Sequence, residues 1–227
     1  GTPKRPRAID ISKELESLGA QFNAFTGHEY TGYYAKVNPQ HLDNALDVVS
    51  DIYLNPLLDE KEIAKEKGVI VEELRMYKDL PHRNVHNLFS SLVYGDQPAG
   101  WNIIGTEENI NGFKREDFKK YIEEHYVAGA TTVIVSGSFD EKETLKKIEK
   151  QFSDISTAQK PEKVPVKESQ TKPEISIQFK ESDQAHLVMG VRSFSARSEY
   201  ETVLNVLSTM LGKGMSSRLW QKLREEM

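Results

Sequence analysis

The fold of this chain is decided by residues 59–78, which read DEKEIAKEKGVIVEELRMYK. Asp59 with Glu62 three residues later is typical of a helix N-cap and its reciprocal partner, so the pattern predicts a long helix that runs to about Lys78. Residues three and four positions apart lie on one face of such a helix. The stripe chosen by that spacing consists of Ile63, Glu66, Ile70, Glu73 and Tyr77.

Two carboxylates therefore interrupt an apolar stripe, and their function depends on whether they are buried or solvated. A buried, unpaired carboxylate is strongly unfavourable, so Glu66 and Glu73 would need a metal, a cation or a hydrogen-bond network opposite them. The alternative is that this face is half buried and both side chains are solvated, as is usual on a Glu-rich helix. That second interpretation is the expected one for Glu60, Glu62 and Glu72.

Apolar spacing and turn residues predict the other elements. Upstream, we expect a helix over residues 11–18, a hairpin with strands over 20–26 and 30–37, and a helix over 42–52. Downstream, we expect helices over 83–94, 113–126, 141–152 and 199–211, and strands over 131–137, 174–180 and 184–192.

Residues 153–173 have a different composition, with Ser, Thr, Gln, Lys and three prolines and little to bury. We interpret this stretch as the connection between two domains. The fold class is therefore expected to be α+β, with an antiparallel sheet packed by helices. A first domain is expected over 1–160, a linker over 161–173, and the start of a similar second domain over 174–227.

Composition argues against several classes of partner. The chain has 30 basic and 35 acidic residues and a net charge of -5, so it lacks the basic stripe typical of nucleic-acid binding. No stretch approaches the ~20 apolar residues of a membrane span. The chain has no cysteine, so any metal must be held by His, Asp or Glu. A reducing compartment fits that composition, and the cytoplasm is the expected location.

An ordered series of landmarks runs through nearly the whole chain. It consists of Gly1-Thr2, Leu18-Gly19-Ala20, Phe22 to Thr26, Tyr33-Tyr34, Leu54-Asn55-Pro56-Leu57 and the pair Glu66 and Glu73. In this order and spacing the chain resembles the inverzincin zinc peptidases, the family of pitrilysin, insulysin and mitochondrial processing peptidase.

The resemblance implies a role for each helix carboxylate. In that family an H-x-x-E-H motif lies a few residues before the Gly-Thr pair, and the third zinc ligand is a Glu further along. Glu73 matches this ligand, and Glu66 matches a second family carboxylate that supports the metal ligands and catalysis. The intact parent is thus expected to be a zinc metalloendopeptidase that hydrolyses peptides.

This sequence departs from the family at the metal motif. It has six His residues and no H-x-x-E-H, so two ligands and the general base are absent. We therefore expect an inactive fragment, incomplete at both ends, that holds no zinc alone. His82 and His86, four residues apart, are an alternative ligand pair, but Arg83 stands where a metalloprotease has its Glu. A further alternative is a non-catalytic scaffold or partner subunit of the same family.

The resemblance also implies substrate contacts. Phe22 to Thr26 matches a family strand whose open edge pairs with an extended peptide, which makes Asn23, Ala24 and Phe25 the expected contacts. Near the end, residues 211–225 resemble a second-domain signature in which Arg224 matches an Arg that holds substrate together with a Tyr. Peptides are the expected partners, with a homodimer or a second family subunit as a possible assembly.

Overall fold

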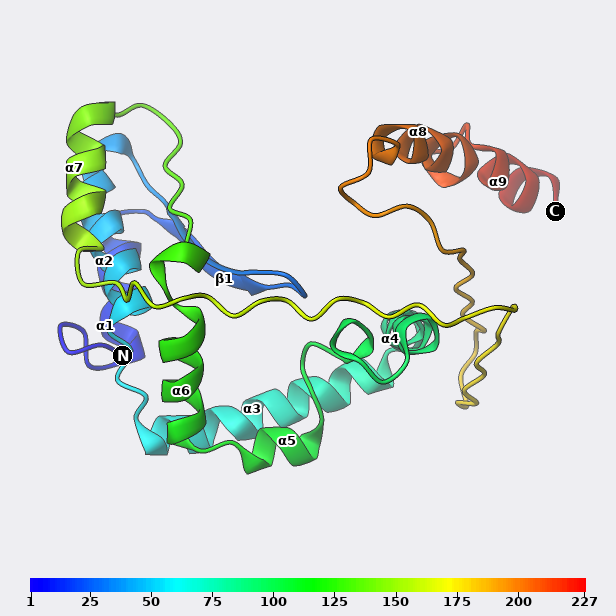
Figure 1. Cartoon of the computed structure of the whole chain (residues 1–227), viewed down its shortest axis with the longest axis horizontal. Coiled ribbons are helices and arrows are strands. Elements are labelled where there is room, and N and C mark those ends of the chain that lie inside the picture. The colour runs from blue at the N-terminus through cyan, green and yellow to red at the C-terminus, as the bar shows by residue number, and fades with distance from the viewer. The chain divides into compact units, whose positions relative to one another are not determined.

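The computed structural model describes all 227 residues and divides into two compact units, Gly1–His186 and Leu187–Met227 (Figure 1). The helices of the first unit are α1 (Ala8–Ser17), α2 (Leu42–Leu54), α3 (Glu60–Asp79), α4 (Pro81–Tyr94), α5 (Glu107–Gly112), α6 (Arg115–His125) and α7 (Glu141–Gln151). Its strands are β1 (Gln21–Thr26) and β2 (Thr31–Lys36). The second unit contains α8 (Glu201–Gly212), α9 (Arg218–Trp220) and a π-helical segment (Gln221–Glu226).

The sheet is a single antiparallel pair of strands. Phe22 pairs with Ala35 and Thr26 with Thr31, which confirms the predicted hairpin. Its turn closes with a hydrogen bond from the Gly27 N–H to the Tyr30 carbonyl at 2.8 Å. With a small antiparallel sheet packed by helices, the chain has the predicted α+β fold class.

The long helix α3 forms where the sequence predicts it. The Asp59 carboxylate accepts hydrogen bonds from the backbone N–H groups of Lys61 and Glu62, at 2.9 and 3.1 Å, and so satisfies two free donors at the helix start. The reciprocal bond from Glu62 is absent, because that carboxylate pairs with Lys65 at 2.6 Å. The helix ends before Pro81, which begins α4.

Two small cores hold the first unit together. In the first, Val71 and Leu74 of α3 pack against Ile110 of α5, and Figure 1 shows α5 lying along α3. The second lies where α2 meets α1 and α7, with Leu15 and Val48 almost fully buried. The hairpin is attached to this second region through β2, which contacts α2.

The three predicted strands downstream are wrong. Residues 131–137, 174–180 and 184–192 are irregular, because a strand needs a hydrogen-bonded neighbour and these segments have none in this chain. Most of their apolar side chains face solvent instead. The most exposed are Ile134, Ile175, Ile177, Phe179, Leu187, Met189 and Val191, each more than four-fifths accessible. Residues 133–139 do line an apolar groove of about 350 Å³ against β2 and α2.

No helix of the structure has both the length and the apolar character that crossing a membrane requires. The predicted limits of the two domains and the linker stay predictions.

Candidate functional site

The two α3 carboxylates lie beside the buried face of the helix. The buried arc of α3 is centred on Val71 and Leu74. Glu73 precedes Leu74 by one residue, which rotates it by about 100° out of that arc. Glu66 lies two turns earlier at nearly the same angle. Both carboxylates are therefore exposed, as the solvated alternative of the sequence analysis expects.

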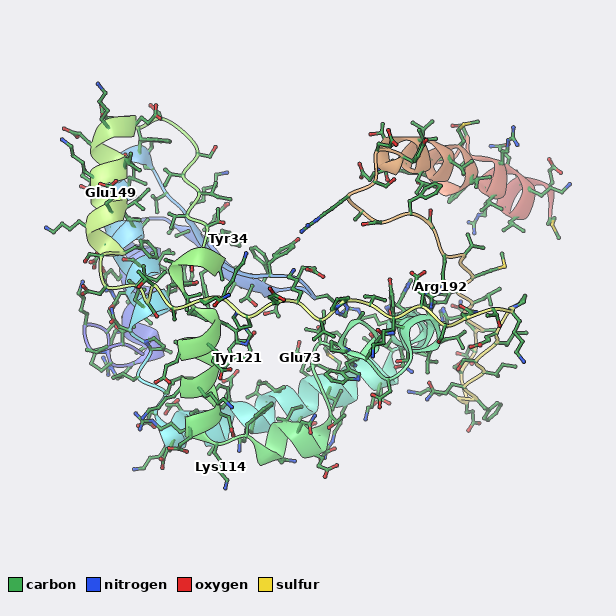
Figure 2. All side chains as sticks on the ribbon, viewed as in Figure 1. Tyr34, Glu73, Lys114, Tyr121, Glu149 and Arg192 are labelled. Carbon is green, nitrogen blue, oxygen red and sulfur yellow. The ribbon has the colours of Figure 1, made fainter.

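Glu66 and Glu73 have no hydrogen bond or ion pair in the structure, whereas Glu62 and Glu72 of the same helix are paired. Glu62 binds Lys65 at 2.6 Å, and Glu72 binds Arg75 at 2.7 Å. Figure 2 shows Glu73 at the edge of α3 rather than between α3 and α5. Two free carboxylates thus share one strip of the helix, with their Cα atoms about 10 Å apart along its axis.

Two basic residues of α3 are bonded to groups other than these two carboxylates. Arg75 bridges Glu72 and Glu107, at 2.7 and 2.8 Å, and these ion pairs raise its pKa. Lys67 donates to the Asn111 carbonyl at 2.9 Å. Neither Arg75 nor Lys67 is therefore paired with Glu66 or Glu73.

Strand β1 has one paired and one open edge. Because Gly27 and Tyr30 form a hydrogen-bonded pair, the pairs that alternate with it are hydrogen-bonded at Phe25, Asn23 and Gln21. The backbone N–H and C=O groups of Phe22, Ala24 and Thr26 consequently point away from β2. They form an open edge of the kind to which an extended peptide can add.

One donor of the open edge is occupied within the chain. The Ala24 N–H donates to the Asn23 side-chain oxygen, Oδ1, at 2.8 Å. Both residues are exposed. The predicted contact residues Asn23 and Ala24 thus interact with each other on the edge that the sequence analysis assigned to the substrate.

Phe25 lies on its own hairpin. Its ring meets Tyr30 edge-on at 5.9 Å and Tyr34 at 6.4 Å between ring centroids, and Figure 2 shows Tyr34 on this hairpin. A Cβ atom on Gly32, opposite Phe25, would lie 2.3 Å from the Phe25 Cζ atom. Glycine at that position therefore lets the ring lie flat over the neighbouring strand.

A tyrosine cluster fixes the hairpin to the helices. The Tyr33 and Tyr126 hydroxyls are 3.2 Å apart, and Tyr53 of α2 hydrogen-bonds Thr131 at 2.7 Å while its ring lies 4.7 Å from that of Tyr126. Burial, and then the hydrogen bond with Tyr33, raise the pKa of the Tyr126 hydroxyl well above its usual range. Sequence analysis missed Tyr53 and Tyr126 because their contacts join positions distant in sequence.

The remaining predicted residues belong to other elements of the chain. His82 and His86 are exposed on α4, and the His82 ring lies 6.1 Å from that of His186. No three His, Asp or Glu side chains converge as a metal-binding group. In the second unit, the Arg224 guanidinium lies over the Trp220 ring at 5.9 Å from its centroid. No hydrogen bond, ion pair or ring contact joins α3 to the hairpin.

Comparison with known families accounts for both halves of the chain. Residues 1–107 match the family model described as insulinase, peptidase family M16, and residues 112–227 match the one described as peptidase M16 inactive domain. The chain belongs to the M16 peptidase family. This family is the one to which pitrilysin belongs, so the resemblance drawn from the landmark residues is confirmed.

Relatives from distant bacteria agree with this assignment. Uncharacterized zinc proteases of Bacillus subtilis and Rickettsia felis are 37% and 36% identical to 96% and 100% of this chain. The chain spans about half the length of these curated relatives, 53% and 54% respectively. A protease structure from Helicobacter pylori has the same fold, with a TM-score of 0.81 at 23% identity, and is matched over 100% of this chain and 55% of its own.

Proposed function

We propose that this M16 chain carries one zinc ligand, Glu73, and the peptide-binding edge, β1, of a zinc metalloendopeptidase. The observation that carries the proposal is that Glu66 and Glu73 are unpaired and exposed on one strip of α3, while Glu62 and Glu72 are paired. A free carboxylate held on a rigid helix is suited to bind a cation. The names of the relatives, zinc proteases, support zinc as that cation.

Glu73 fits zinc in its chemistry. Carboxylate oxygens bind Zn²⁺ at about 2.0–2.2 Å, and a catalytic zinc has three protein ligands and an open position. When bound, such a zinc ion lowers the pKa of a water molecule to about 7 and polarises a carbonyl group. This chain contributes one negative charge through Glu73, and Glu66 adds a second beside it. Its sequence has no H-x-x-E-H motif, so the chain alone is inactive.

The open edge of β1 binds the peptide in extended form. Outward-facing N–H and C=O groups at Phe22, Ala24 and Thr26 offer alternating donors and acceptors to a peptide backbone. Pairing through the main chain tolerates many peptide sequences. The tyrosine cluster holds the opposite strand to α2, so the edge is presented on a fixed hairpin.

A non-catalytic family subunit is the second candidate. The match of residues 112–227 to an inactive-domain model is consistent with it, but Glu66, Glu73 and β1 lie within residues 1–107, which match the insulinase model. On this alternative, Glu66 and Glu73 are solvated helix residues and the hairpin edge binds a partner or nothing.

Peptide hydrolysis by a protein extended upstream through the family metal motif tests the proposal. A quenched fluorescent peptide should be cleaved by the extended protein, with activity lost to a chelator and restored by zinc. The 227-residue chain should show no cleavage at the same zinc concentration. An extended protein with an intact H-x-x-E-H motif that is folded but inactive with zinc would favour the non-catalytic alternative.

A further inference from the structure

We propose that the Asn23 side chain is a removable cover on the open edge of β1, bonded to the Ala24 N–H until a peptide takes its place. This inference rests on the proposed function, in which that edge receives an extended peptide. It assigns Asn23 a positioning role that acts before the peptide binds, in addition to any contact made afterwards.

The hydrogen bond and the strand register together support the cover. The register turns the Ala24 N–H away from β2, toward the side on which a third strand would add. The Asn23 Oδ1 atom accepts this N–H at 2.8 Å, and the Asn23 amide has no other hydrogen bond in the structure. Phe22 and Thr26 point the same way but have no such side-chain partner. The cover therefore sits on the middle one of three outward-facing positions.

The chemistry gives the cover two consequences. An exposed strand edge pairs indiscriminately with other strands, and a side chain that occupies its central donor weakens that pairing. A peptide must exchange the Asn23 bond for its own, so the cover lowers peptide affinity by the roughly two- to tenfold that one net hydrogen bond contributes. After rotating away, the amide still offers a donor and an acceptor near the peptide backbone.

The cover and a simple contact predict opposite changes in peptide affinity when the Asn23 side chain is removed. If Asn23 only contacts the peptide, removing its side chain weakens binding. If it covers the edge, Asn23→Ala strengthens binding roughly two- to tenfold. Asn23→Asp is the matched control, because its carboxylate keeps an acceptor for the Ala24 N–H and should leave that donor covered.

Amide hydrogen exchange by NMR on the 227-residue chain tests the cover without any ligand. In the wild type, the Ala24 amide should exchange more slowly than the Phe22 and Thr26 amides, which are the internal controls on the same edge. Asn23→Ala should raise Ala24 exchange to their level, and Asn23→Asp should keep it slow. An Ala24 amide that exchanges as fast as Phe22 and Thr26 in the wild type would overturn the cover.

Peptide titration separates the cover from the function on which it rests. The probe is a fluorescent peptide of alternating valine and threonine with lysines at its ends. Tighter binding to Asn23→Ala and loss of binding to Ala24→Pro support both. If Ala24→Pro loses peptide binding while Asn23→Ala binds the peptide as well as or more weakly than the wild type, the cover alone is overturned. Wild-type affinity in a folded Ala24→Pro variant overturns peptide binding at this edge, and the cover with it.

Discussion

Arg5 is buried among acidic side chains and ties the start of the chain to α1 and α2. Its guanidinium bonds Glu14, Asp47 and Asp51 at 2.6 to 2.8 Å, and the Asp51 side chain is only 2% exposed. Thr2 adds a hydroxyl bond to Asp51 at 2.5 Å. Leaving one charge of such a buried pair without its partner costs about 3–5 kcal/mol. The cluster therefore explains why a charged N-terminal segment folds back onto the helices.

This cluster predicts how stability depends on pH. Burial raises the pKa of Asp47, but hydrogen bonds from Lys4 and Arg5 outweigh it and leave the pKa below its usual value. The Asp47 contribution is thus complete above the unfolded pKa of about 3.9 and is lost as the pH falls through the lower, folded pKa. Urea unfolding from pH 7 down to 2 should show that loss. Asp47→Asn should lower the free energy of unfolding at pH 7 and make it fall less steeply between about pH 4 and pH 2. The same steepness in wild type and variant would contradict the assignment.

Glu66 and Glu73 should differ in what they do. In the upstream-extended protein, Glu66→Gln should retain zinc and lose roughly 10- to 100-fold in rate, because a carboxylate that only supports the ligands affects their orientation. Metal analysis and peptide cleavage of the same preparation measure both quantities. Loss of zinc from Glu66→Gln would make Glu66 a ligand and reverse the two roles.

Single residues were predictable from sequence where their partners are local. The Asp59 cap was predictable because the N–H groups that it binds are two and three residues away. Sequence spacing placed Glu66 and Glu73 on one strip but did not give their exposure, since that depends on where α5 packs. The Arg5 cluster went unnoticed because Asp51 lies 46 residues from Arg5.

Helices and strands, like single residues, were predictable where their hydrogen-bond partners are local in sequence. Helices were predicted because their hydrogen bonds close within four residues, and each predicted helix has a counterpart, although the one over 113–126 begins later, at Arg115. The hairpin was predicted because its turn is local. The strands over 131–137, 174–180 and 184–192 alternate as strands do, but strand structure needs a partner and this chain provides none.

The edge of β1 predicts a contrast between two proline variants. Ala24→Pro removes an outward-facing N–H and leaves the bonds to β2, so the hairpin should persist and peptide cleavage by the extended protein should fall sharply with zinc content unchanged. Phe25→Pro is the control, because it removes a donor to β2 and should lower the melting temperature. A folded, zinc-loaded Ala24→Pro variant that cleaves at the wild-type rate would show that peptides bind elsewhere.

The molecule as a whole comprises two compact units, and the carboxylate strip and the hairpin both belong to the first. Within the 227 residues no three possible ligands converge, and one Glu cannot supply the three protein ligands of a catalytic zinc. After dialysis against zinc, the chain alone should therefore hold far less than one ion per molecule. One tightly held ion per chain would contradict this prediction and would favour His82 and His86 as the alternative ligand pair.

Zinc content of the upstream-extended protein is the most direct test of Glu73 as a ligand. Glu73→Gln is to be compared with Glu72→Gln, which changes the adjacent exposed carboxylate, one paired with Arg75 in this structure. Both proteins are dialysed against a weak chelator and analysed for metal by atomic emission, with circular dichroism to confirm folding. The expected result is about one zinc per molecule in the wild type and in Glu72→Gln, and almost none in Glu73→Gln. Equal zinc in the two folded variants would contradict the assignment of Glu73.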